Sequence, residues 1–161
     1  MTVRDRLAAL GLTLPEVAAP VAAYVPAVRS GAHVWTSGQL PFVTGALPAT
    51  GKVGAEVDAD AAAGLARVAA LNALAAVGAL LAEEDGGDPV AALERVRRVV
   101  KVVGFVASAA SFTGQPGVVN GASLLLHEVL GDAGVHARSA VGVAVLPLDA
   151  PVEVELVVET D

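Results

Sequence analysis

The stretch of residues 136–159 places the strongest limit on the fold, because it contains two runs with the pattern of β-strands. In the second run, Glu153 and Glu155 alternate with valines, and a period of two is typical of a strand with one buried face. Arg138 opens the first run, and a turn at residues 146–151 separates the two. If the two strands pair as antiparallel neighbours, Arg138 and Glu153 will lie at one rim of a sheet.

Two long helices are predicted before this stretch. Asp58 is a good N-cap for a helix that runs to about Leu81. A second helix is predicted for residues 117–130, and Gly131 is its expected end. The first helix carries apolar residues at spacings of three and four, which mark one buried stripe: Leu65, Val68, Leu71, Leu74, Val77 and Leu81.

The remaining strands complete an α+β pattern. Residues 22–28 are predicted as an edge strand, because Pro26 cannot donate a hydrogen bond to a neighbour. A turn at residues 29–32 joins it to a strand at residues 33–40, and a long strand follows at residues 95–107. The order β-β-α-β-α-β-β predicts one mixed sheet with both main helices packed on one face.

The length of 161 residues predicts a single domain, residues 1–161. Residues 1–22 form an N-terminal extension with a short helix, which Thr2 caps with Asp5 at its third position. The first residues are charged and no apolar signal-peptide core follows them, so we expect a cytoplasmic protein. Residues 59–82 are apolar largely through alanine, which favours a buried helix over a membrane span.

The composition argues against several kinds of site. A net charge of −7 disfavours a nucleic-acid surface. Without cysteine there is no disulfide, thiolate nucleophile or cysteine metal site, and the three histidines lack metal-ligand spacing, so no metal is expected. Dinucleotide, Walker and Gly-x-Ser-x-Gly motifs are missing. One basic cluster is interpreted as a strand start that balances the acidic residues before it: Arg95, Arg97, Arg98 and Lys101.

A small polar set remains as candidate chemistry: Tyr24, Ser37, Asn120, Arg138 and Glu153. Arg138 is the most informative, because a guanidinium can hold a carboxylate with two parallel hydrogen bonds. Structural roles stay open for each residue. These are a strand-end salt bridge for Arg138, an outward strand face for Glu153, a helix cap for Asn120, a turn hydroxyl for Ser37 and packing for Tyr24. The residues alone therefore predict an α+β domain with a candidate carboxylate site.

Together these residues resemble the RidA family, also called YjgF/YER057c/UK114, of reactive-intermediate deaminases. The resemblance covers roughly residues 23–159, and the predicted order of elements agrees with that family's chorismate-mutase-like fold. Its anchors are Tyr24-Val25, Thr36-Ser37-Gly38-Gln39-Leu40-Pro41, Asn120, Ala137-Arg138-Ser139, and Leu146-Pro147 followed by Val152-Glu153-Val154-Glu155.

The resemblance implies a homotrimer with clefts between neighbouring subunits, and no cofactor or metal. It implies hydrolysis of small imines and enamines, such as 2-aminoacrylate, to a 2-keto acid and ammonia. Arg138 then pairs with the carboxylate of the imine or keto acid, and Glu153 positions the attacking water. Tyr24, Ser37 and Asn120 line the pocket, which a neighbouring subunit is expected to complete.

The chain also departs from the family's shorter members. Ala140 stands two residues after the arginine, where close relatives often have cysteine, so this pocket contains no thiol. The N-terminal extension, a longer loop at residues 42–56 and an insertion at residues 83–93 indicate a longer branch. Two other functions stay open. One is a regulatory trimer that binds a small carboxylate without turnover. The other is an endoribonuclease, against which the acidic charge and the few aromatic residues argue.

Overall fold

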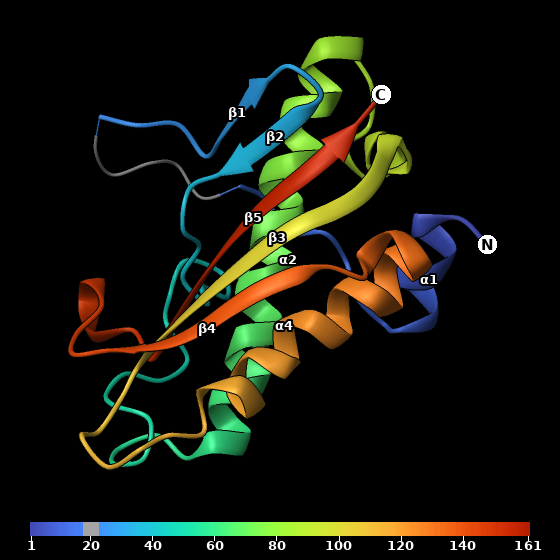
Figure 1. Cartoon of the computed structure of the whole chain (residues 1–161). Coiled ribbons are helices and arrows are strands. Elements are labelled where there is room, and N and C mark those ends of the chain that lie inside the picture. The colour runs from blue at the N-terminus through green and yellow to red at the C-terminus, as the bar shows by residue number, and fades with distance from the viewer. Residues whose placement is uncertain (18–22) are drawn as a thin grey trace.

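The computed structural model describes residues 1–17 and 23–161, in which five strands form one mixed sheet. The strand order is β1–β2–β5–β3–β4 (Figure 1). β3 and β4 are parallel, and the other neighbours are antiparallel, so the predicted mixed sheet is confirmed. The strands are β1 (Ala27–Ser30), β2 (His33–Thr36), β3 (Val96–Ala107), β4 (Ala137–Val143) and β5 (Val152–Thr160).

Both main helices pack on one face of the sheet, as predicted (Figure 1). In β5 the residues that face the helices are buried, whereas Glu153, Glu155 and Val157 on the other face are half-buried. The helices are α1 (Val3–Ala9), α2 (Ala59–Asp85), α3 (Pro89–Ala92) and α4 (Gln115–Leu130). Three short 3₁₀ helices are η1 (Leu93–Arg95), η2 (Gly131–Gly134) and η3 (Pro147–Asp149).

α1 and α2 begin at the capping residues predicted from the sequence, and other predicted helix ends differ by a few residues. Thr2 and Asp5 form the reciprocal capping box at the start of α1, and Asp58 caps α2. α2 continues four residues beyond the predicted Leu81 and ends where Gly86 takes a left-handed conformation, with φ of 67°. α4 begins two residues earlier than predicted, because a proline is tolerated in its first turn.

The predicted pairing of the two closing strands is wrong. β3 lies between β4 and β5, and it pairs with β4 in parallel and with β5 antiparallel. The physical reason is that α4 carries the chain from the end of β3 back to the start of β4, which is how parallel neighbours are connected. The segment between β4 and β5 contains η3 and is not a hairpin turn.

The first hairpin is present but shorter than predicted. β1 begins at Ala27, immediately after Pro26, and β2 ends at Thr36. Beyond β2, Gln39 still forms an isolated bridge to Val154 of β5. The predicted edge strand also included Ala22, which lies outside the described residues.

α2 and α4 approach each other closely because small residues line their contact. Gly121 of α4 lies against the backbone of Ala63, so a Cβ at Gly121 would collide with the Ala63 carbonyl oxygen. α2 is long and apolar enough to cross a membrane by composition, yet 67% of its most apolar window is buried within the protein. The prediction of a buried core helix for this segment is therefore confirmed.

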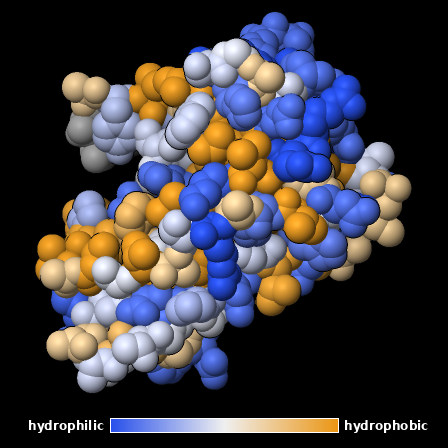
Figure 2. Space-filling view, viewed as in Figure 1, coloured by the Kyte–Doolittle hydropathy of each residue, from blue (hydrophilic) through white to orange (hydrophobic). Residues whose placement is uncertain are grey.

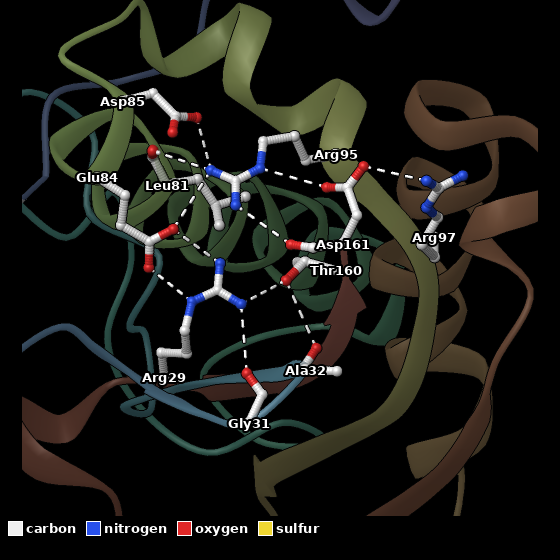
Figure 3. Close-up of polar contacts among 10 residues, drawn as sticks. All are labelled: Arg29, Gly31, Ala32, Leu81, Glu84, Asp85, Arg95, Arg97, Thr160 and Asp161. Carbon is white, nitrogen blue, oxygen red and sulfur yellow. Dashed lines mark hydrogen bonds and ion pairs between the residues drawn. The ribbon is translucent and has the colours of Figure 1, made fainter.

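A network of ion pairs ties the C-terminal ends of α2 and β5 together (Figure 3). Arg95 lies 2.6 Å from the Asp85 carboxylate and 3.3 Å from that of Asp161, and Arg97 also pairs with Asp161 at 3.1 Å. The predicted balancing of the preceding acidic residues is confirmed for Arg95, whereas Arg97 pairs with Asp161 at the C-terminus instead. The wider network also contains Arg29, Gly31, Ala32, Leu81, Glu84 and Thr160.

In the part of the chain that the structure describes, no element covers the face of the sheet opposite the helices. Its side chains mix apolar and charged residues, and Trp35 and Val141 are 51% and 44% exposed. Figure 2 shows hydrophobic and hydrophilic surface side by side over the strands. A surface of this kind is suited to contact with another protein, because protein interfaces also combine apolar and polar side chains.

Substitution of Gly121 tests the close helix contact. Gly121→Ala forces α2 and α4 apart, and overpacking of this kind costs about 1–3 kcal/mol of the free energy of unfolding. Gly64→Ala is the matched control, because a Cβ there meets open space and alanine stabilises a helix interior by about 0.5–1 kcal/mol. Thermal unfolding at one protein concentration measures both. A Gly121→Ala variant at least as stable as Gly64→Ala would contradict this packing.

Candidate functional site

Arg138 of β4 points toward α4 and is held by three oxygen atoms. Its Nη1 donates to Asn120 Oδ1 at 2.8 Å and to Ser123 Oγ at 3.1 Å, both on α4. Its Nη2 donates to the carbonyl oxygen of Pro116 at 3.0 Å, in the first turn of the same helix. Arg138 therefore has no carboxylate partner among the described residues, and the predicted alternative of a strand-end salt bridge is wrong.

Within residues 1–17 and 23–161, this arrangement leaves part of the guanidinium free. Both hydrogens of Nη1 and one of Nη2 are used there, so the Nε–H and the second Nη2–H remain without a partner among these residues. Those two groups lie on one edge of the guanidinium and can donate in parallel to a carboxylate. Asn120 contributes by fixing Arg138 from the second turn of α4, which is a different role from the helix cap that its position also suggested.

An open hollow of about 340 Å³ lies beside Arg138, between α4 and the start of β4. His136 enters it with Nε2 at 2.9 Å from Ser123 Oγ and Nδ1 at 2.6 Å from the Gly134 carbonyl oxygen. Burial lowers the pKa of His136, the Gly134 carbonyl opposes this, and the charge of Arg138 lowers it further. The lining residues are Asn120, Ser123, His127, Gly134, Val135, His136 and Arg138.

The other predicted site residues gather at the end of β2 and the start of β5. Ser37 Oγ donates to the Val25 carbonyl oxygen at 2.7 Å, next to Tyr24, whose side chain is 48% exposed. Gly38 lies directly against Glu153, where a Cβ would collide with the carboxylate. Glycine at position 38 is therefore what lets Glu153 keep its place beside Ser37.

Glu153 is unusual for a strand carboxylate, because it is half-buried and no described residue donates a hydrogen bond to it. Burial raises the pKa of Glu153, and the negative charge of Glu155, two residues along the same face, raises it further. A carboxylate in such surroundings holds its proton to a higher pH than an exposed glutamate does, and this suits it to exchange protons with a reacting group.

Within one chain, Arg138 and Glu153 do not form a single site. Arg138 is in register with Val102 of β3, which is buried under the helices. Glu153 is in register with Phe105 of β3 and therefore lies on the uncovered face. The expectation of one shared rim is wrong for a single chain, because β3 separates the two strands and the two side chains lie on opposite faces.

The five predicted residues thus form two groups. Arg138 and Asn120 lie together near α4, and Tyr24, Ser37 and Glu153 lie together near the β2 end. Ser123 and His136 were not among the predicted site residues, although Ser123 contacts Arg138 and His136 contacts Ser123 in the same hollow. The sequence did contain a signal for His136, because it lies two residues before Arg138 at the start of a strand. Residues two apart in a strand lie on the same side of the sheet.

Comparisons with known proteins agree with this fold. Residues 4–160 match a family model described as "YjgF/chorismate mutase-like, putative endoribonuclease". Protein TCP17 of Trypanosoma cruzi is 45% identical over 160 residues, which cover 98% of this chain and 93% of TCP17.

Two solved structures show a close and a more distant likeness. Protein Atu1372 of Agrobacterium tumefaciens, of unknown function, is 46% identical, with a TM-score of 0.88, and the match covers 99% of this chain and 92% of that one. Escherichia coli TdcF is 25% identical, with a TM-score of 0.59, covering 92% and 96%. The much closer superposition on Atu1372 is consistent with a longer branch of the family.

The pKa of Glu153 can be tested without any assumption about activity. Glu155→Gln removes the neighbouring negative charge, so the pKa of Glu153 falls and its carboxylate ionises at lower pH. Titration of the Glu153 side-chain carboxyl signal by ¹³C NMR measures this. Glu159→Gln is the matched control, because it removes the same charge from the same strand about 20 Å away, beyond the screening length. A midpoint that Glu155→Gln leaves unchanged would contradict the coupling.

Proposed function

The chain belongs to the YjgF/chorismate mutase-like family, and from this membership we propose that it hydrolyses small 2-imino acids to 2-keto acids and ammonia. The substrate class is the carboxylate-bearing imines and enamines, such as 2-aminoacrylate and its imine form. The reaction needs neither a cofactor nor a metal, because the imine carbon is already electrophilic. The observation that carries the proposal is the free edge of the Arg138 guanidinium.

That free edge supports carboxylate binding for two reasons. Three oxygens of α4 hold the rest of the guanidinium, so the cation is oriented before the substrate arrives and loses little rotational freedom on binding. The crystal structure of Escherichia coli TdcF, a structural relative, has bound serine, which is itself a small carboxylate. We propose that Arg138 of this chain also binds a small carboxylate.

The separation of the two groups of site residues supports a homotrimer with sites between subunits. Arg138 lies on β4, an edge strand of the sheet, with Asn120 beside it on α4, while Glu153 lies on the uncovered face of the sheet. In a closed ring of three identical chains, every interface joins the same two different surfaces, and we propose that these are the β4 edge of one subunit and the uncovered face of the next. One subunit then supplies Arg138 and Asn120, and its neighbour supplies Tyr24, Ser37 and Glu153.

In the proposed reaction, Arg138 holds the carboxylate and Glu153 takes a proton from water. The water oxygen forms a bond to the imine carbon while the imine nitrogen takes a proton from solvent, which gives a neutral carbinolamine. Glu153 then returns the proton to the nitrogen, the C–N bond breaks, and ammonia leaves as the carbonyl forms with loss of the hydroxyl proton to solvent. Most of the rate gain comes from fixed orientation of water and substrate, with proton transfer as the second contribution.

RNA cleavage, which the family description names, has less support in this chain. Arg95 and Arg97, the start of the basic cluster, are paired with acidic side chains. The net charge is −7, so few unpaired cations are available to release counterions from a phosphate backbone. The alternative of a trimer that binds a carboxylate without turnover shares Arg138 with our proposal, and turnover separates the two.

Substitution of Arg138 tests the proposed function. Arg138→Ala removes two charge-assisted hydrogen bonds of about 1.5 kcal/mol each, so kcat/KM falls roughly 100-fold. The assay generates 2-iminopropionate in situ and follows its loss with and without protein. Arg98→Ala is the matched control, because this exposed arginine is on β3 and outside both groups. Equal inactivity of wild type and Arg138→Ala across several imines would refute deamination. Pyruvate binding by an inactive wild type would identify a binding protein instead.

A further inference from the structure

His136 is hydrogen-bonded at both ring nitrogens, beside the arginine that carries the proposed function. Nδ1 lies 2.6 Å from the Gly134 carbonyl oxygen, which can only accept, so Nδ1 carries the hydrogen. In the neutral ring Nε2 is then an acceptor, and the Ser123 hydroxyl at 2.9 Å donates to it. The contacts of the ring therefore select one tautomer.

The same serine is also an acceptor. Arg138 Nη1 donates to Ser123 Oγ at 3.1 Å, so the donors run in one direction from Arg138 through Ser123 and His136 to the Gly134 carbonyl oxygen. Hydrogen bonds aligned in a chain polarise one another and strengthen. A cation at the donor end and a carbonyl at the acceptor end favour this direction over the reverse.

We infer that Ser123 and His136 form a positioning relay for Arg138, which holds the guanidinium so that its free edge faces the substrate carboxylate. This rests on the proposed function, in which Arg138 binds that carboxylate. Asn120 and the Pro116 carbonyl fix two other N–H groups of Arg138, and the relay fixes the third. His136 acts through Ser123 and does not touch the substrate.

The relay depends on a neutral His136. Burial lowers the pKa of His136, and so does the charge of Arg138, so the neutral ring persists at neutral pH. From α4, His127 faces the same hollow, and the 3₁₀ turn η2 contributes the Gly134 carbonyl, with its Asp132 exposed. If Nε2 were protonated, both His136 and Arg138 would donate to Ser123 Oγ, which breaks the aligned chain. A second positive charge would also lie beside Arg138.

A serine beside a histidine is also the arrangement of a nucleophile and its base. Here one lone pair of Ser123 Oγ already accepts from Arg138. Ser123 also lies in the middle of α4, where backbone N–H groups are used within the helix and none is left to stabilise an oxyanion. These contacts favour the positioning role.

The relay is tested with Ser123→Ala, which removes the hydroxyl, and Ser123→Thr, which keeps it. For Ser123→Ala, the Kd for pyruvate and the KM for 2-iminopropionate rise roughly ten-fold, with kcat within about two-fold, since one hydrogen bond to the guanidinium is lost. Ser123→Thr restores both constants. Ser30→Ala and His33→Gln, on the first hairpin, are the controls and leave them unchanged.

The pH dependence gives a second readout. In the wild type, KM rises as the pH falls through the pKa of His136, because protonation breaks the relay. In His136→Gln this rise is lost, since the amide does not titrate. A KM that follows the same pH profile in both proteins overturns the relay, and so does labelling of Ser123 by a fluorophosphonate, which would identify a nucleophile.

NMR separates failure of the relay from failure of the proposed function. In the wild type, the ¹⁵N signals of His136 report the Nδ1–H tautomer, and the Nη1 hydrogens of Arg138 are resolved because the side chain is held. In Ser123→Ala the signals of those hydrogens average, because the guanidinium is no longer held and rotates. If the wild type neither binds pyruvate nor consumes imine, the proposed function fails, and these signals still confirm the relay. Unchanged Arg138 signals in Ser123→Ala overturn it.

Discussion

The position of β3 between β5 and β4 is the constraint on which the site depends. It separates Arg138 from Glu153 by a full strand, and their registers with β3 put them on opposite faces of the sheet. A single chain can therefore bind a carboxylate with one group of residues or exchange a proton with the other. Combining the two chemistries requires a second copy of the chain, which is why the proposed function and the proposed homotrimer depend on each other.

The helix layer determines how well Arg138 is oriented. α4 supplies the Asn120, Ser123 and Pro116 oxygens that hold the guanidinium, and its own position is set by the close contact of Gly121 with α2. A buried alanine-rich α2 permits that approach, because larger side chains would separate the helices. The small residues at the contact of α2 and α4 are thus part of what positions the binding group.

Much of this was predictable from local patterns. The starts of α1 and α2 were predicted from their caps, Thr2 and Asp58, and the extent of α2 from the spacing of its apolar residues. The last strand was predicted from the alternation around Glu153. The strand order was not predictable from the same signals. A period of two shows which side chains share a face, but it does not identify the neighbouring strand. Ser123 was missed because its contact with His136 joins a helix to the loop before β4, and neither residue belongs to the matched motifs.

The central claim is that one subunit supplies Arg138 and the next supplies Glu153, and mixed oligomers test it most directly. Arg138→Ala alone keeps only about one hundredth of the wild-type kcat/KM, and Glu153→Gln alone is also strongly impaired. When they are co-expressed with different tags and the mixed species is purified, every mixed ring of three contains one interface with both native residues, so activity returns to about one third of the wild type. Activity that stays absent in the purified mixed species would contradict a shared site and place both residues' functions within single subunits.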